Sequence, residues 1–457
     1  MSQVLYVHAK GGPPVGHALT RVAGRATVHL LALSGLPVGV REDAARLCAS
    51  VVTPSRAEHA DLVELITTRA RAVGADAVLT FSEYAVVAVA EACRRLGLRG
   101  AGAAAALARD KRLMRATWDR HGVPQPRFRP VAGLAELERA TIELSCPLLL
   151  KAAWSAGSTA HQIIDEPGQA RHAWHRSRQV MAESAQLGFA EMHVRGASED
   201  FIVEEIVTGR AEEWFDGPGW GDYVSVEGVV VDGDFRPVCL SGRMPTVWPF
   251  TERAGITPAA VDSGAQRRIV ELARRAVDAL GLENCGTHTE IKLGADGRMW
   301  VIETAARFGG AMTVPQIEDV FGLDLVGMFT DQLLGRSPGW PARTLTPADA
   351  EGAAGSLVVL AVDGDGTPWP RRHLWDSSTV LRKAPIGAGS TLSVVRESSL
   401  PDGSPVPVYD PAGGANTMAG LCLLSADRPQ SVVRDFTALV AALPDLLPVD
   451  AAEEARA

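Results

Sequence analysis

The sequence predicts an α/β protein in which a parallel sheet is followed by antiparallel hairpins. In residues 1–105, short apolar runs alternate with segments of helical periodicity, which indicates a parallel sheet of the doubly wound kind. Residues 222–234 and 286–310 each have the pattern of an antiparallel hairpin. Beyond about residue 335 the composition shifts toward proline and glycine with short strand-like runs, which predicts a β-rich C-terminal region.

The length of the chain predicts about three domains, because 457 residues exceed the size at which a single hydrophobic core is usual. We expect an N-terminal α/β domain at residues 1–105. The middle domain, 106–335, is expected to divide into subdomains of about 106–205 and 206–335. Residues 336–457 are interpreted as a β-rich lid region that ends in a helix.

The N-terminal domain is expected to place a loop at the carboxyl end of its sheet. Residues 10–14 read Lys-Gly-Gly-Pro-Pro directly after the first predicted strand. The loop lacks both the GxGxxG spacing of a dinucleotide-binding fold and the GK[ST] of a P-loop, so we interpret it as a loop beside which a substrate can lie. The strands of this domain are predicted at 4–7, 26–33, 50–53 and 77–81, and its helices at 57–73 and 84–96.

Charge, apolar content and cysteine spacing argue against several classes of protein. The formal charge of −9 is spread without long like-charge blocks, which argues against nucleic acid as a partner. No run of 18 or more apolar residues is free of charge, and the N-terminus lacks the pattern of a signal peptide. We therefore expect a cytoplasmic protein without a membrane partner. The six cysteines form no CxxC pair, which argues against zinc sites and a disulfide framework.

A strand followed by a loop of small residues predicts a phosphate-binding site near Lys151. The apolar run 147–150 leads into this lysine, and residues 152–159 read Ala-Ala-Trp-Ser-Ala-Gly-Ser-Thr. Backbone amides of such a loop can hold phosphate oxygens while the lysine supplies charge, although a plain turn is the alternative. Lysine is rare in this chain, which suggests that it is kept where a compact charge is needed. Of the 45 basic residues, the five lysines are Lys10, Lys111, Lys151, Lys292 and Lys383.

Other elements follow from the same reading of apolar periodicity and turn residues. In the middle domain we expect a helix from residue 107 that ends near 122, an extended segment at 127–131, a helix at 133–144, a strand within 201–209 and a helix at 269–280. In the C-terminal region we expect strands at 356–362, 378–382, 391–396 and 419–424, a last helix at 429–443, and an acidic tail.

The hairpin at 286–310 is predicted to separate a polar face from an apolar one. If residues 294–297 form the turn, Leu293 lies opposite Arg298, His288 opposite Glu303 and Glu290 opposite Val301. The polar face then holds His288, Glu290, Lys292 and Glu303, and the apolar face holds Thr289, Ile291, Leu293, Trp300 and Ile302.

Two carboxylates on the polar face predict a site for a divalent cation. Glu290 and Glu303 are expected on diagonal positions, roughly 7 to 8 Å apart at the backbone, so that their oxygens can converge on a hard cation. Magnesium is commonly held by one or two carboxylates together with substrate phosphates. Arg307 follows beside Gly309 and Gly310, where its guanidinium suits a carboxylate or phosphoryl oxygen. The alternative is a charged, solvated hairpin face.

In this order the motifs resemble the ATP-grasp superfamily, and most closely its carboxylate-amine ligase branch, which includes the bacterial L-amino acid ligases. The resemblance covers roughly residues 75–330 and implies an ATP-grasp fold. Five motifs carry it: DKRLMR followed by GVPQP, LLLKAAWSAGS, FIVEEIVTG, DYVSVEGVVVDG, and HTEIKL with VIETAARFGG.

The resemblance implies a role for each matching residue. Lys111 and Lys151 are expected to contact the phosphates of ATP, and Glu290 and Glu303 to bind Mg²⁺, with Mn²⁺ as the alternative. Arg307 is expected to bind the substrate carboxylate and the acylphosphate formed from it. Further nucleotide contacts are implied for Ser158 and Lys292, and for the hinge residues Glu204, Glu205 and Ile206 at the adenine edge. Asp222 is expected at the ribose, with Glu212 as the alternative. Gly309 and Gly310 are expected to contact the substrate.

One position departs from the superfamily pattern. Many ATP-grasp enzymes read Glu-x-Asn-x-Arg where this chain has Ala305, and the asparagine is a further metal ligand in those enzymes. The L-amino acid ligase branch accepts a small residue there, so we interpret Ala305 as a subgroup marker. How a second metal would be coordinated is left open.

Four more residues are candidates with an alternative each. Arg243 is expected to contact phosphate or carboxylate, or else to form a structural ion pair. His288 is a candidate base for the incoming ammonium, or else a hydrogen-bond partner of a metal-binding carboxylate. Glu227 is expected to hold a substrate amino group, or else to form a hinge or salt bridge. Glu83 lies at the end of a predicted strand, where this family often places substrate contacts.

The resemblance implies an ATP-dependent ligase that converts a carboxylate, expected to be an amino acid, into an acylphosphate and joins it to an amine. An amide or dipeptide, ADP and phosphate are the expected products. Small-molecule substrates are thus the expected partners, and dimers are common among similar enzymes. The alternatives are a carboxylase of the purine or biotin carboxylase type that uses bicarbonate, and a noncatalytic nucleotide-binding regulator.

Overall fold

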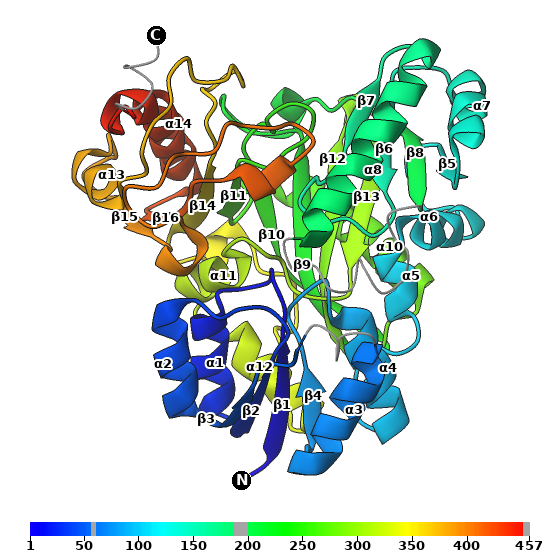
Figure 1. The fold of residues 1–457 in the computed structure, drawn as a ribbon, viewed down its shortest axis with the longest axis vertical. Coiled ribbons are helices and arrows are strands. Elements are labelled where there is room, and N and C mark those ends of the chain that lie inside the picture. Colours follow the sequence, from blue (N-terminus) through cyan, green and yellow to red (C-terminus); the bar gives the residue numbers. More distant parts are fainter. Residues whose placement is uncertain (56–60, 187–199, 451–457) are drawn as a thin grey trace.

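The computed structural model describes residues 1–55, 61–186 and 200–450. Three sheets organise this part of the chain: a four-stranded sheet near the N-terminus, a second four-stranded sheet, and a central eight-stranded sheet. Figure 1 shows the N-terminal sheet at one end of the molecule and the other two sheets at the opposite end. None of the helices in the described ranges combines the length and the apolar character needed to cross a lipid bilayer.

The N-terminal sheet is parallel, as predicted, with strand order β3-β2-β1-β4. Alternate residues of its central strand face opposite cores: Val4 and Tyr6 on one side, Leu5 and Val7 on the other. Helices cover both faces, which is the doubly wound arrangement. The elements are β1 (Gln3–His8), α1 (Val15–Ala23), β2 (Thr27–Ala32), α2 (Val38–Leu47), β3 (Cys48–Val52), α3 (Leu62–Val73), β4 (Ala77–Leu79) and α4 (Val86–Leu96).

Helix α3 begins where a side chain can cap it. The Asp61 carboxylate accepts a hydrogen bond from the Glu64 amide, and Gly74 ends the helix with a φ of 60°. The sequence predicted a start at residue 57, and residues 57–60 lie outside the described ranges.

The smaller antiparallel sheet has the order β5-β8-β6-β7. The single helix predicted from residue 107 is two helices, because Asp110 is extended and its carboxylate caps a new helix by accepting from the Arg112 amide. Lys111 therefore lies in the first turn of that second helix. The elements are α5 (Ala105–Arg109), α6 (Lys111–Arg120), β5 (Phe128–Val131), α7 (Leu134–Leu144), β6 (Leu148–Ala152), β7 (Gln162–Ile164), α8 (Ala170–Gln186) and β8 (Phe201–Glu205).

The central sheet has the order β13-β12-β9-β10-β11-β14-β16-β15, so three strands of the C-terminal region continue the sheet of the middle domain. Its strands are β9 (Tyr223–Val231), β10 (Asp234–Arg243), β11 (Ala254–Thr257), β12 (Cys285–Leu293), β13 (Met299–Ala305), β14 (Ala353–Val359), β15 (Thr391–Val394) and β16 (Gly420–Ala426). The helices of this part are α10 (Ser263–Leu280), α11 (Thr313–Phe321), α12 (Leu325–Leu333), α13 (Ser377–Lys383) and α14 (Pro429–Leu446).

The strand predicted at 378–382 is wrong, because this segment is helix α13. Its first turn is capped by Asp376, whose carboxylate accepts from the Thr379 amide and hydroxyl. A run of only five residues does not distinguish a strand from a short helix by periodicity, and the capping residue lies outside that run.

The register predicted for the β12–β13 hairpin is also wrong. Leu293 pairs with Met299. On β13, the extra residue Ile302 forms a bulge opposite Glu290 and Ile291 and shifts the pairing again, so that Glu290 lies directly opposite Glu303. His288 consequently lies opposite Ala305. The cause is a connection one residue longer than predicted, together with one extra residue, Ile302, in the second strand.

The bulge also changes the predicted faces of β13. Val301 pairs with Ile291 and is buried, whereas Trp300 pairs with Lys292 and is partly exposed. The predicted place of Trp300 on the apolar face is therefore wrong. Glu290 and Glu303 are closer than the diagonal prediction allowed, since directly opposite residues are nearest neighbours across strands.

Candidate active site

The polar residues predicted from separate motifs meet between the small sheet and the central sheet. The Lys111 Nζ lies 3.4 Å from the Glu303 carboxylate, which joins α6 to β13. Lys151 on β6 and Glu204 on β8 belong to the small-sheet side, and Glu290 on β12 belongs to the central-sheet side. We call Lys111, Arg115 and Lys151, together with the buried Glu204, the cationic wall. Glu290 and Glu303 are the carboxylate wall.

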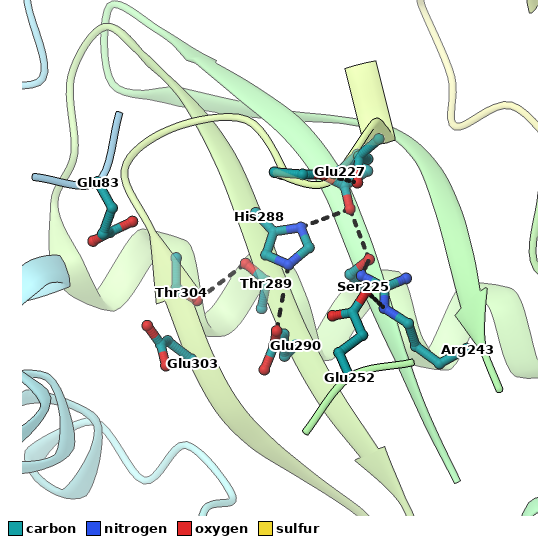
Figure 2. A network of polar contacts seen from close by, with 12 residues as sticks. Glu83, Ser225, Glu227, Arg243, Glu252, His288, Thr289, Glu290, Glu303 and Thr304 are labelled. Carbon is teal, nitrogen blue, oxygen red and sulfur yellow. Dashed lines mark hydrogen bonds and ion pairs between the residues drawn. The ribbon is translucent and has the colours of Figure 1, made fainter. Parts of the chain in front are cut away.

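The carboxylate wall is formed by Glu290 and Glu303, whose side chains are each about 25% exposed. Figure 2 shows them next to one another on the same side of the hairpin. Burial alone raises the pKa of Glu290, but the hydrogen bond and charge of His288 outweigh it and lower this pKa to about 2. Glu290 is thus an anion near neutral pH.

These two carboxylates fit a divalent cation that is shared with a phosphate ligand. No group of three or more His, Cys, Asp or Glu side chains suited to a metal occurs within residues 1–55, 61–186 and 200–450. Ala305, opposite His288, supplies no ligand atom from its side chain. The donor set is therefore two hard oxygen groups, and magnesium bound with substrate phosphates requires no more than that from the protein.

A buried chain of polar contacts lies beside this pair (Figure 2). His288 Nδ1 is 2.7 Å from the Glu227 carboxylate, and its Nε2 is 3.4 Å from that of Glu290. Ser225 donates to Glu227 at 2.7 Å and accepts from Arg243 at 2.9 Å. Burial lowers the pKa of an imidazole, but Glu227 outweighs this and raises the His288 pKa to about 9. His288 is therefore a cation held between two carboxylates.

Arg243 and His288 both make the contacts expected from the alternative role of each. For Arg243 this role is a structural ion pair, and for His288 it is a hydrogen bond to a carboxylate predicted to bind metal. The buried guanidinium of Arg243 has its Nε 3.2 Å from Glu252 and lies over the ring of Tyr223. His288 contacts Glu290, the residue predicted to bind metal. Ser225 was missed in the sequence, and its position two residues before Glu227 on a strand was the signal that it shares that face.

Two cations of the cationic wall contact a single buried carboxylate. Glu204 accepts from Arg115 at 2.7 Å and lies 2.7 Å from Lys151 Nζ. Burial raises the pKa of Glu204, but these two cations outweigh it and lower this pKa to about 2. Lys111 donates to the Ser155 carbonyl at 2.7 Å. Arg115 was missed, although it follows Lys111 by four residues on α6 and so lies on the same face of that helix.

Glu83 and Arg307 form an ion pair at the boundary with the N-terminal domain. Arg307 Nε lies 2.7 Å from one oxygen of Glu83, and Arg109 Nε lies 3.6 Å from the other. The charges of the neighbouring cations outweigh burial and lower the pKa of Glu83. Gly310 is near this boundary as well, with space for a Cβ that would first meet Gly12 at 4.0 Å. The predicted loop at residues 10–14 thus borders the site.

The small-residue loop after β6 is fixed by contacts from two other segments. The Ser158 hydroxyl donates to the Phe250 carbonyl at 2.9 Å, and the φ of Ser158 is 60°. From the C-terminal region, Asn416 donates to the Thr159 hydroxyl at 3.0 Å and Ala412 accepts from the Ala160 amide at 2.8 Å. The loop is therefore held in one conformation by chain that is distant in sequence.

The other predicted residues make contacts of their own. Glu205 pairs at 2.8 Å with Arg127, whose side chain is mostly exposed. Asp222 pairs at 2.7 Å with Lys292. Glu212 is exposed and lies 3.3 Å from Arg210. Of the two predicted ribose-binding acids, Asp222 is the less exposed.

Two predicted residues without charge are placed by packing. Ile206 is half-buried after the end of β8. Gly309 packs so closely on His288 and Thr313 that a Cβ would not fit.

Comparison with known proteins shows which proteins this chain resembles. Residues 144–315 match the family model described as ATP-grasp domain. Alanine–anticapsin ligase from Bacillus amyloliquefaciens is 39% identical over 274 residues, which are 60% of this chain and 57% of that protein. The match thus spans less than two thirds of the length of that relative.

Solved structures share the fold over almost the whole chain. The L-amino acid ligase from Bacillus licheniformis has a TM-score of 0.68 at 18% identity and covers 98% of both chains. A biotin carboxylase from Campylobacter jejuni has a TM-score of 0.64 at 16% identity, covering 98% of this chain and 92% of that one. The predicted ATP-grasp fold and the likeness to amino acid ligases are thereby confirmed.

Proposed function

The chain carries an ATP-grasp domain, and from this premise we propose that it is an ATP-dependent carboxylate-amine ligase. In the proposed reaction an amino acid carboxylate becomes an acylphosphate and is then joined to the amine of a second substrate. ADP and phosphate are released. The proposal rests on the 39% identity to a protein named as a ligase and on the arrangement of the site residues.

The observation that carries the proposal is the pairing of two walls of opposite charge. On one side Arg115 and Lys151 contact the single carboxylate of Glu204, and Lys111 donates to the Ser155 carbonyl. Glu290 and Glu303 stand on the other side, where Glu303 contacts Lys111. A magnesium nucleotide carries both kinds of partner, because its phosphates need cations and its metal needs carboxylates. The 3.4 Å contact between Lys111 and Glu303 shows how near the walls are.

The chemistry needs alignment and fixed charge rather than a side-chain nucleophile. A carboxylate oxygen attacks the γ-phosphorus, the bond from that phosphorus to the β,γ-bridging oxygen breaks, and ADP leaves. The amine nitrogen then attacks the acyl carbon, phosphate leaves, and the nitrogen loses a proton. Lys111, Lys151 and Arg307 are suited to stabilise the charge on the transferred group, because they are basic side chains held in place by their partners.

Glu290 and Glu303 would hold Mg²⁺, with Mn²⁺ as the alternative. When bound, such an ion neutralises negative charge on the phosphates of ATP. His288 is positioned by Glu227 and in turn positions the Glu290 carboxylate. Asp222, beside Lys292, is proposed to contact the ribose.

Substrate recognition is proposed at the boundary between Glu83, Arg307 and the loop at residues 10–14. In the present structure Glu83 satisfies Arg307, and a substrate carboxylate or phosphoryl group would take over part of that bond. Glu83 is then available to an ammonium group, whereas Glu227 stays paired with His288. The relative named alanine–anticapsin ligase supports an amino acid as one substrate.

The test is the release of ADP by the purified full-length protein with ATP and Mg²⁺, scanned over pairs of amino acids, with mass spectrometry of the product. We expect ADP only with particular pairs, and a product whose mass is the sum of both amino acids minus water. ADP release with bicarbonate alone would overturn the proposal in favour of a carboxylase. Binding of ATP without turnover on any pair or on bicarbonate would favour a regulator.

A further inference from the structure

A line of hydrogen bonds joins the central sheet to the loop after Arg307. Ser241 Oγ lies 2.8 Å from Thr257 Oγ1, which donates to Gln316 Oε1 at 3.0 Å. Gln316 Nε2 donates to Ser356 Oγ at 2.9 Å, and Ser356 donates to the Ala311 carbonyl at 2.5 Å. The four side chains are at most 2% exposed. Water therefore does not compete for these bonds.

The line has a single direction. A hydroxyl has one hydrogen to donate. Because Thr257 uses its hydrogen on Gln316, Ser241 must be the donor to Thr257. Gln316 accepts through its oxygen and donates through its nitrogen, so Ser356 accepts from it and can only donate onward. Every donated hydrogen thus points toward the Ala311 carbonyl, and the line ends on the main chain.

The main chain at this end has a conformation that it does not adopt readily. Ala311 has a φ of 48° and Met312 a φ of 76°, both in the left-handed region that a Cβ disfavours. Such residues persist where the surrounding structure holds them. Helix α11 begins at Thr313, directly after them. The segment 307–312 is therefore a strained turn between the substrate arginine and a helix.

Two apolar anchors hold the remaining parts of this segment. Phe308 packs edge-on against Phe329, with ring centroids 5.5 Å apart, in the core of the N-terminal domain and α12. Met312 lies in a buried apolar cluster with Val358 and Tyr409 of the C-terminal region. Between these anchors, Gly309 and Gly310 have no side chain to pack. The bond from Ser356 to Ala311 supplies a polar anchor at that point.

We propose that Gln316 and Ser356 are positioning residues that hold the segment 307–312, and with it Arg307, in the geometry needed for the reaction. This inference rests on the proposed function, in which Arg307 binds the substrate carboxylate and the transferred phosphoryl group. Neither residue touches a substrate in this arrangement; both act through the main chain of Ala311.

The same line connects this segment to the carboxylate wall. Ser241 lies opposite Ser225 in the β9–β10 pairing, and Ser225 lies opposite Glu290 in the β9–β12 pairing. One row across the sheet therefore carries Glu290 and the first member of the line. The strand that carries Glu290 and the segment 307–312 are thus both connected to β10 through Ser241.

The first measurement is hydrogen exchange of the full-length protein, which does not depend on activity. In Ser356→Ala, removal of the bond is expected to speed exchange of the amides of residues 309–313 about tenfold, since one buried hydrogen bond is lost. Ser356→Thr keeps the hydroxyl and should exchange like the wild type. The matched control is Ser425→Ala, because the Ser425 hydroxyl also donates to helix α11, but at Asp319, near the opposite end of the helix from the loop.

The second measurement is turnover. Ser356→Ala is expected to lower kcat about tenfold while the KM for ATP stays within about twofold, since the nucleotide contacts are untouched and one bond is lost. Ser356→Thr should recover most of kcat, and Ser425→Ala should retain it. If Ser356→Ala does not fold, Gln316→Met keeps the side-chain length and breaks the line one step earlier.

Two results would overturn the proposal: unchanged exchange at 309–313 in Ser356→Ala, or an equal loss of kcat in Ser425→Ala. If the wild type shows no amino acid-dependent turnover, the proposed function fails by that result. The exchange measurement still decides in that case whether the line holds the segment.

Discussion

The cationic wall and the carboxylate wall differ in how far their carboxylates are buried and paired. On the cationic wall, Glu204 is buried and already satisfied by Arg115 and Lys151, so an anionic ligand would meet cations whose places are set in advance. On the carboxylate wall, Glu290 and Glu303 stand side by side and keep a quarter of their surface exposed. The first wall is preorganised for its ligand, and the second keeps carboxylate surface open to a cation.

This difference predicts that the walls fail differently when altered. Loss of a carboxylate on the exposed wall removes a ligand and little packing, so it should affect turnover more than folding. Loss of a cation on the buried wall leaves Glu204 short of partners, so it should affect both nucleotide binding and stability. The predictions below test this contrast, beginning with the largest effect.

Glu303→Ala is expected to abolish turnover, with a loss of about a thousandfold or more, because metal stabilisation of the phosphoryl group is worth several kcal/mol. The melting temperature should stay close to that of the wild type, since Glu303 is partly exposed. Rates of ADP release and a thermal melt of the same preparation measure both. Wild-type turnover in this variant would remove Glu303 from the metal site.

Lys151→Met is expected to raise the KM for ATP about tenfold to a hundredfold, because a charge-assisted hydrogen bond contributes about 1.5–3 kcal/mol. Initial rates over a range of ATP concentrations give the value. Lys383→Met is the matched control, since Lys383 is exposed at the end of α13. Equal KM values in the two variants would show that Lys151 serves Glu204 alone.

Arg115→Met is expected to lower the free energy of unfolding by about 2 kcal/mol at pH 7, less than a fully broken buried pair because Lys151 stays beside Glu204. Urea unfolding measures this difference. The Glu204 pKa of about 2 lies below its ordinary value of 4.5, so the stabilisation is complete above pH 4.5 and is lost as the pH falls toward 2. The difference in free energy of unfolding between Arg115→Met and the wild type should become smaller over the same pH range. A difference that stays constant with pH would mean that the lost stability comes from packing.

Much of the carboxylate wall could be predicted from the sequence, because its residues lie in one continuous hairpin. Strand periodicity placed Glu290 and Glu303 on one face, and the structure brings them together. Their pairing could not be predicted, because a bulge at Ile302 depends on packing and not on residue type. The correction strengthens the metal assignment, since directly opposite carboxylates are nearer than diagonal ones.

The cationic wall could be predicted only in part, because its contacts link residues far apart in the chain. Lys111 and Lys151 stood out as rare lysines, but Arg115 is one arginine among many. Its bond to Glu204 spans 89 positions and leaves no local pattern. The C-terminal strands raised the same difficulty: their runs were visible, but not the sheet that they join.

Asn416→Ala is expected to weaken the binding of ADP about threefold, in line with one hydrogen bond of about 0.5–1 kcal/mol. The side chain of Asn416 donates to Thr159 in the small-residue loop, so its loss should loosen the cationic wall without touching a charge. ADP binding by calorimetry measures the effect. An unchanged affinity would show that the backbone contacts from Ala412 suffice to hold the loop.

Glu205→Gln is expected to have the smallest effect, with the KM for ATP changed by no more than about twofold, since an exposed ion pair contributes little. Glu204 and Glu205 are neighbours on β8, and strand alternation sends them to opposite faces. Glu204 therefore joins the cationic wall, while Glu205 pairs with Arg127 near the surface. Any nucleotide contact at this position should then come from the main chain, which the substitution keeps. A tenfold rise in KM in Glu205→Gln would place its carboxylate on the nucleotide and would mean that the wall includes both glutamates.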